Sequence, residues 1–400
     1  MPDVSSLKTS ADVVTPMRRS GTPRFVALDG LRGVAAVIVV AYHAVLASDL
    51  GDAFLGVLDG EPTGSQEALL LANSPLHYGL MGPEAVIVFF VLSGFVLVLP
   101  LLNGRGMDLW EYYPRRVLRL WLPSAASVVL AVLIILSTSQ HPGDAHSEWG
   151  RFYSVEELDA GTVLDSLFLI TGTTHLNNPL WSLRWELLFS LFLPVAFLLV
   201  ARITRGHWAW LVACGILSGS GAFLGVQALT WGPMFLAGGI VAARVRAEGP
   251  DVPRRAPWAW LVGGVLILGV PDTVRVALGV TDAAVLSGLG DGAVTVGAAL
   301  IVYGLSRPSA LAALFTLRPI RFLGRISFSL YLVHAPILIG AIHVAPEHPR
   351  RALAVAVPVA FVVAWLFARF VEEPSARLAR RVGALASAAA HGWRDPVQAR

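Results

Sequence analysis

The 400-residue chain is 55% hydrophobic and only 14% charged, whereas a soluble domain carries about 25% charged residues. Its apolar residues are gathered into runs of roughly 20, the length that crosses a bilayer as a helix. These features exclude an ordinary soluble protein. The net charge is only +3 and the arginines lie between the apolar runs, which indicates membrane topology and argues against nucleic-acid binding.

The N-terminal segment 1–23 is polar and contains arginines, without the short apolar region and cleavage site of a signal peptide. It is predicted to be a disordered cytoplasmic leader, followed by a transmembrane domain over 24–374 and a cytoplasmic tail over 375–400. Cys214 is the single cysteine and lies in an apolar run, so an intrachain disulfide and a cysteine metal cluster are excluded. No metal site is expected elsewhere, because the spacing of His141, His146 and His175 in the second long loop, 139–179, matches no ligand pattern.

Apolar stretches bounded by arginine, proline or acidic clusters predict an all-α integral membrane protein, a bundle of about ten transmembrane helices. The predicted spans are 25–47, 84–102, 122–138, 180–203, 207–226, 228–244, 257–271, 290–306, 326–344 and 351–371. Two long loops, 48–83 and 139–179, are the segments expected to form an extramembrane surface.

The basic residues predict the orientation, because cytoplasmic loops retain Lys and Arg. With the N-terminus inside, ten spans place 24 of the 30 basic residues in cytoplasmic segments and four in outer loops, and leave Arg32 and Arg184 within spans. Both termini are therefore predicted to be cytoplasmic. The pair Arg350 and Arg351, in the last outer loop, is the one local exception to the rule that basic residues stay in cytoplasmic loops.

Among the ionisable residues inside predicted spans, where each costs about 2.5–3.5 kcal/mol and needs a partner, a cavity or a function, four stand out. They are Arg32, His43, Arg184 and Glu186. Arg32 and His43 are eleven residues apart, which is about 16 Å along one helix face, so both can line one internal channel. The structural alternative is that Arg32 extends its side chain to the inner membrane surface and that His43 is a hydrogen-bonded histidine of the core.

A series of motifs accompanies these residues in order along nearly the whole chain. The first is Asp29-Gly30-Leu-Arg32-Gly33 followed by Tyr42-His43, and the next two are Phe89-Phe-Val-Leu-Ser93-Gly94-Phe95 and Tyr113-Pro-Arg115-Arg116-Val-Leu-Arg119. The last three are Trp181-Ser182-Leu-Arg184-Trp-Glu186, Gly324-Arg-Ile-Ser327-Phe-Ser-Leu-Tyr331-Leu-Val-His334 and Glu373-Pro374. Together they resemble the membrane acyltransferase 3 family, whose mark is Arg-x10-His in the first span. The sequence departs from the family pattern at two positions. Glu84 lies two residues earlier than the usual acidic residue before Phe-Phe, and Leu187 stands where a second glutamate is common after the Trp-Ser-Leu motif.

The resemblance implies an O-acyltransferase that moves an acyl group, expected to be acetyl, from cytosolic acyl-CoA to a hydroxyl group. The acceptor is expected to be a carbohydrate, a glycolipid or a glycosylated natural product. Acyl-CoA is then a co-substrate, no cofactor is bound, and the expected location is the cytoplasmic membrane of a bacterium.

The resemblance also assigns candidate roles. His43 is the candidate base, Glu186 the residue that orients its imidazole or stabilises the charged form, and Arg32 the guide for the donor. Three arginines are candidates for the CoA phosphates, with positive-inside anchoring as the alternative: Arg115, Arg116 and Arg119. Six residues are assigned to the substrate pocket: Trp181, Ser182, Arg184, Ser327, Tyr331 and His334.

Two further interpretations remain open from the residues alone. Buried Arg, His and Glu also build the ion sites of a proton-coupled secondary transporter, although no internal repeat typical of transporters is evident. Ser93 and Gly94 are interpreted as helix packing and not as a nucleophile and its turn.

Overall fold

The computed structural model describes residues 25–249 except 173, together with 257–270 and 282–392. The predicted leader lies outside these residues. The described part of the chain is helical throughout, with no strand. Its longer helices are α1 Val26–Ala47, α4 Gly82–Leu102, α5 Leu109–Thr138, α8 Leu180–Leu191, α9 Leu193–Ala201, α10 His207–Phe223, α11 Gln227–Glu248, α12 Pro257–Leu268, α14 Ala283–Leu305, α16 Arg318–Val344, α17 Pro349–Phe367 and α18 Glu373–Gly392.

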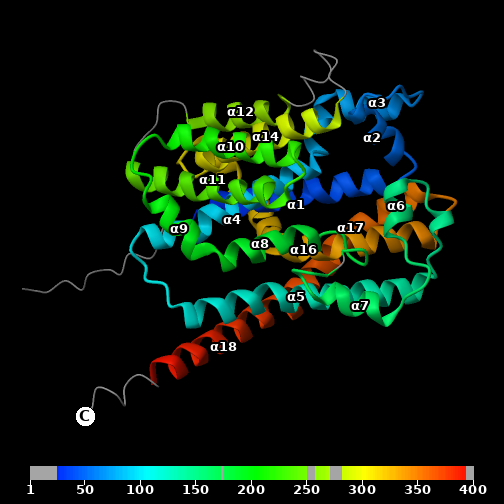
Figure 1. Cartoon of the computed structure of the whole chain (residues 1–400). Helices are drawn as coiled ribbons and strands as arrows, with labels where there is room; N and C mark the ends of the chain where they lie inside the picture. Colours follow the sequence, from blue (N-terminus) through cyan, green and yellow to red (C-terminus); the bar gives the residue numbers. More distant parts are fainter. Residues whose placement is uncertain (1–24, 173, 250–256, 271–281, 393–400) are drawn as a thin grey trace, which may run out of the picture.

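The shorter helices lie in the connections. In the first long loop they are α2 Gly51–Asp59, α3 Gln66–Asn73 and the 3-10 turn Pro75–Gly79; in the second they are the 3-10 turn Pro142–Asp144, α6 Glu148–Tyr153 and α7 Ala160–Leu167. Helix α15 Ala310–Leu314 precedes α16, and a π-helical turn, Ala368–Glu372, joins α17 to α18. Both long loops lie at one end of the bundle, with α2 and α6 to the right in Figure 1. We call this the loop end, and the opposite end, which carries most of the arginines, the arginine-rich end.

The all-helical membrane character predicted from the sequence is confirmed, and the described residues of each of the ten predicted spans lie mainly in helices. Among the described residues, seven helices are long and apolar enough to cross a membrane, or eight if the bent pair α8 and α9 forms one span. Helices α10 and α12 have only 17 and 12 residues. The total of ten spans and the location of the termini therefore stay predictions.

Three helices extend well beyond the predicted spans at the arginine-rich end, because hydropathy marks only the apolar part of a helix. Helix α5 begins at Leu109, where Asp108 caps its first turn by accepting a hydrogen bond from the Trp110 amide. Helix α16 begins at Arg318. The predicted tail is helical up to Gly392 as α18, which lies alongside α5 at the bottom of Figure 1.

The predicted span 180–203 is broken rather than straight. Helices α8 and α9 meet at an angle of 64°, and Pro194 lies in the first turn of α9, where the missing proline N–H is tolerated. Two hydroxyls of α5 satisfy carbonyls at the break: Tyr112 donates to Ser190 O and Tyr113 to Leu191 O, each at 3.1 Å. The break is thus held by α5.

Glycines allow the central helices to approach closely. A Cβ at Gly94 of α4 would overlap the carbonyl of Phe235 in α11, and one at Gly238 of α11 would overlap the carbonyl of Val91 in α4. This reciprocal contact supports the packing interpretation of Gly94. Helix α1 packs in the same way on α16, where Gly33 meets the backbone of Gly324.

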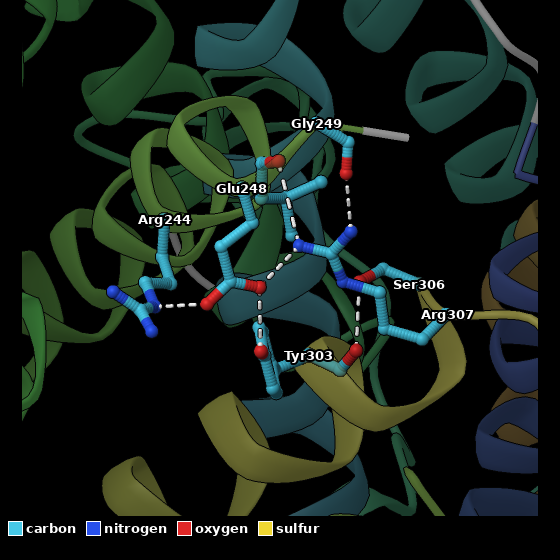
Figure 2. A network of polar contacts seen from close by, with 7 residues as sticks. Arg244, Glu248, Gly249, Tyr303, Ser306 and Arg307 are labelled. Carbon is cyan, nitrogen blue, oxygen red and sulfur yellow. Dashed lines mark hydrogen bonds and ion pairs between the residues drawn. The ribbon is translucent and has the colours of Figure 1, made fainter. Parts of the chain in front are cut away.

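A polar network ties the ends of α11 and α14 together at the arginine-rich end, as Figure 2 shows. Glu248 lies between Arg244 and Arg307, with 2.6 Å separating its Oε2 from Nη2 of Arg307. The Tyr303 hydroxyl donates to the same Oε2 at 2.7 Å, and Arg307 Nη1 donates to the Gly249 carbonyl at 2.6 Å. The side chain of Arg307 is only 2% exposed. These basic residues therefore have a structural role beyond setting orientation.

Candidate functional site

A cavity of about 490 Å³ lies between α1, α4, α5, α8, α16 and the π-helical turn. Exposed Arg105 and Gly106, in the connection between α4 and α5, mark its mouth at the arginine-rich end. Two buried residues form the inner end of the cavity. They are Ser182 of α8 and Tyr331, which lies half-way along α16. The volume is within the range of small-molecule sites.

The cavity wall is rich in charge and has an excess of positive groups. Its basic residues are Arg32, Arg105, Arg115, Arg116, Arg119 and Arg325, and its acidic residues are Asp108, Glu111, Glu186 and Glu372. Six guanidinium groups against four carboxylates favour an anionic ligand. At the mouth, the Ser387 hydroxyl of α18 hydrogen-bonds Asp108 and lowers the pKa of that carboxyl, so it stays ionised.

The arginines of α5 differ in their surroundings. Arg115 pairs with Glu111 on the partly exposed face of its own helix, at 3.3 Å. Arg116 donates from Nη2 to Glu186 Oε1 at 2.6 Å and from Nε to Ser190 Oγ at 2.8 Å, which ties α5 to α8. Arg119 has no hydrogen bond or ion pair among the described residues, and it interacts electrostatically with Arg32 and Glu372.

The expected pairing of Glu186 with His43 is wrong. Glu186 accepts the hydrogen bond from Arg116, and Ser93 Oγ lies 3.5 Å from the same carboxylate oxygen. The partner of His43 is His334, with 2.9 Å between His43 Nδ1 and His334 Nε2. Glu186 and His43 lie on opposite sides of the Ser182–Tyr331 contact, so the helix spacing that placed both near one level did not place them together.

The hydrogen bonds of the histidine pair define its tautomers. His334 Nδ1 lies 3.1 Å from the Leu330 carbonyl, which can only accept, so this nitrogen carries the proton. In neutral His334, Nε2 is then the acceptor and His43 Nδ1 donates to it. His43 Nε2 is left with its lone pair available, which is the state required of a general base. His334 is completely buried and His43 is 9% exposed.

Tyr331 separates the cavity from the histidine pair. Its hydroxyl lies 2.7 Å from Ser182 Oγ, and its ring lies 5.9 Å from the ring of His334 between centroids. Neither His334 nor His43 lines the cavity itself. A ligand in the cavity therefore meets the Ser182–Tyr331 contact before it reaches the imidazoles.

The other predicted pocket residues take different positions. Ser327 lines the cavity with Ser182 and Tyr331. Trp181 instead packs on Phe90 and Trp231, and Arg184 donates to the carbonyls of Leu169 and Gly172 in the second long loop. Arg184 therefore holds this loop and does not face the cavity.

Five charged residues of the cavity wall were given no role at the site from the sequence: Arg105, Asp108, Glu111, Arg325 and Glu372. Arg325 lies within the motif that runs from Gly324 to His334, and Glu372 directly precedes Glu373. Glu372 lies in the π-helical turn and accepts a hydrogen bond from Ser329 Oγ at 2.6 Å. Such turns rotate the following side chains relative to an α-helix and are common at functional sites, but they have no sequence signature. Only the neighbouring motif could have drawn attention to Glu372.

Comparison with known proteins identifies the family of the chain. The family model described as an acyltransferase domain matches residues 25–369, so the described helical bundle belongs to a family of acyl-transferring membrane enzymes. The chain belongs to the acyltransferase 3 family, which confirms the resemblance and favours an enzyme over a transporter.

Individual relatives are more distant. The chain is 24% identical to peptidoglycan O-acetyltransferase OatA of Listeria monocytogenes, over 87% of this chain and 55% of the relative. It is 28% identical to acyltransferase MdmB of Streptomyces mycarofaciens, over 48% of this chain and 43% of the relative. It is 30% identical to protein 2 in the picA locus of Rhizobium radiobacter, over 44% of this chain and 83% of the relative. The chain thus spans about half the length of the first two relatives. No solved structure matches it.

Proposed function

We propose that the protein is an O-acyltransferase of the bacterial cytoplasmic membrane that moves an acyl group from cytosolic acyl-CoA to a hydroxyl of a carbohydrate or glycosylated acceptor. The observation that carries the proposal is the alignment of an arginine-lined cavity, the Ser182–Tyr331 contact and the His43–His334 pair along one path. The names of the relatives, one of which acts on peptidoglycan, support an acetyl group and a glycan acceptor.

The donor enters the cavity from the arginine-rich end. Arg119 and Arg32 are the arginines proposed for its phosphates, because they interact electrostatically with each other on the cavity wall and neither is engaged in an ion pair among the described residues. Guanidinium groups bind phosphate oxygens in a two-pronged geometry. The thin pantetheine arm then carries the thioester past Tyr331 toward His43, so the side chains of Ser182 and Tyr331 must separate during turnover.

His43 acts as the base in the transfer step. The acceptor oxygen attacks the thioester carbonyl carbon while its proton passes to His43 Nε2. The carbon–sulfur bond breaks, and the leaving thiolate takes the proton from the imidazolium, which yields the ester and free CoA. His334 orients the ring through the hydrogen bond to His43 Nδ1. A transient acyl group on His43 Nε2 is the alternative route with the same products.

Release of CoA from labelled acetyl-CoA tests the function directly. Purified protein in lipid nanodiscs is incubated with the donor and a panel of glycans, glycolipids and glycosylated small molecules. We expect release that depends on one acceptor class and is abolished in His43→Ala, while CoA still binds. Turnover in His43→Ala of a tenth of wild type or more would refute the base assignment, since positioned proton transfer contributes about 10²–10⁴-fold.

The proposed orientation has its own test. A reporter fused after Arg400 should signal from the cytoplasm, and one inserted in 48–83 should signal from outside. The reverse pattern at either site would place the arginine-lined cavity away from the cytosolic donor.

A further inference from the structure

The imidazole of His43 contacts two aromatic rings. His334 of α16 lies on one side, with ring centroids 5.1 Å apart and planes 24° from parallel. Trp149 of α6 lies on another, with centroids 5.0 Å apart and planes 20° from parallel. Trp149 comes from the second long loop and was not selected from the sequence.

Helix α6 is anchored at both ends, so the position of Trp149 is defined. At its start, Asp52 of α2 accepts a hydrogen bond from the Glu148 amide at 2.7 Å and one from Arg151 Nη2 at 3.2 Å. At its end, the Ser154 hydroxyl lies 2.6 Å from His343 Nε2 of α16. A six-residue helix that is marginal alone is thus fixed to α2 and to α16, the helix that carries His334.

No carboxylate among the described residues forms a hydrogen bond or ion pair with His43, so the charge that forms on it during transfer has no such partner there. Within the part of the chain that the structure describes, the polar and aromatic neighbours of this imidazole are His334, Tyr42 and Trp149. In hydrolases with a catalytic triad, a carboxylate stabilises the imidazolium. A neutral histidine offers a hydrogen-bond acceptor but no negative charge. The electron-rich face of an indole attracts a cation stacked on it.

We propose that Trp149 is a positioning residue for the transfer reaction, which holds the His43 imidazole and stabilises its imidazolium form through the indole face. The inference rests on the proposed role of His43 as base. Because the imidazolium exists only after the acceptor proton has moved, this contact stabilises the transition state more than the ground state. Its loss lowers kcat and leaves KM for donor and acceptor near the wild-type values.

Fluorinated tryptophans introduced at Trp149 test the electronic part of the proposal, because fluorine withdraws electron density from the ring with little change of shape. A cation–π contact contributes from about 0.5 to 2 kcal/mol, so kcat should fall stepwise with each fluorine, by roughly 2- to 30-fold in total. Trp149→Phe should retain more activity than Trp149→Leu. The same series at Trp260, which stacks on Trp208 of α10, is the matched control and should leave kcat unchanged.

Chemical modification of His43 tests its contact with Trp149 without measuring enzyme turnover. Diethyl pyrocarbonate acylates accessible imidazoles, and peptide mapping gives the rate at His43 alone. Trp149→Leu should raise this rate severalfold, whereas Trp260→Leu should not. An unchanged rate, or a kcat that does not respond to fluorination at Trp149 while His43→Ala is inactive, would overturn the role of Trp149 alone. An active His43→Ala variant would instead overturn the proposed function, and the inference with it.

Discussion

Arg116 and Arg119 lie one turn apart on α5, but the structure gives them different expected functions. Arg116 is held by Glu186 and Ser190, whereas Arg119 faces the cavity beside Arg32 without an ion pair among the described residues. Replacing each with glutamine keeps much of the side-chain volume and removes the charge. We expect Arg119→Gln to weaken donor binding and Arg116→Gln to weaken the fold.

The magnitudes follow from the contacts. A hydrogen bond to a charged group contributes about 1.5–3 kcal/mol, so Arg119→Gln should raise the Kd for CoA about 10- to 150-fold. The side chains of Arg116 and Glu186 keep 15% and 21% of their exposure. Their pair is worth more than a surface pair and less than a fully buried one, so Arg116→Gln should lower the unfolding free energy by about 1–2 kcal/mol.

Calorimetric titration of CoA into purified protein measures the first effect, and thermal unfolding followed by tryptophan fluorescence measures the second. Arg246→Gln is the control, because Arg246 is exposed at the same end of the bundle and does not line the cavity. Arg119→Lys should give an intermediate Kd, since lysine keeps the charge and loses the planar fork. If Arg116→Gln weakened CoA binding more than Arg119→Gln did, the assignment of the phosphate site would be refuted.

Three further outcomes are expected. His334→Leu should lower kcat by roughly 2- to 13-fold with KM unchanged in the transfer assay, because the lost hydrogen bond to the catalytic imidazole is worth roughly 0.5–1.5 kcal/mol; an unchanged kcat would contradict its orienting role. Gly238→Ala should lower the unfolding free energy by about 1–3 kcal/mol through overpacking against α4, whereas Gly232→Ala on the same helix, with open space around it, should be neutral or stabilising in the same thermal assay. The hydrogen bond from Arg350 lowers the pKa of Asp49, so its stabilising effect is present above the unfolded value near 3.9 and is lost as the pH falls through the lowered value; Asp49→Asn should therefore reduce the melting temperature at pH 7, and by progressively less as the pH is lowered below about 3.9.

Arg32 and His43 of α1 could be predicted from the sequence because charge inside an apolar run is costly and rare, and Arg116 and Arg119 of α5 because they lie in a motif that resembles the family's. Arg32, Arg116 and Arg119 all line the cavity, and His43 is half of the buried histidine pair. Likewise, an apolar run of spanning length has few alternatives to a helix, since no other backbone form satisfies its hydrogen bonds in lipid. These conclusions depend on residue type and local period, which a single sequence contains.

Which of these residues meet was decided only by the tertiary structure. Helix spacing places Glu186 and His43 at similar depths along the bundle. The packing of α5 on α8 instead pairs Glu186 with Arg116, and the packing of α1 on α16 pairs His43 with His334. Trp149 reaches His43 because α6 is anchored to α2 and α16, elements distant in the sequence. The sequence determined the helices and their charged positions, because those follow from the cost of polar groups in lipid; the partners depended on helix rotation and crossing, which arise from side-chain packing across the whole bundle.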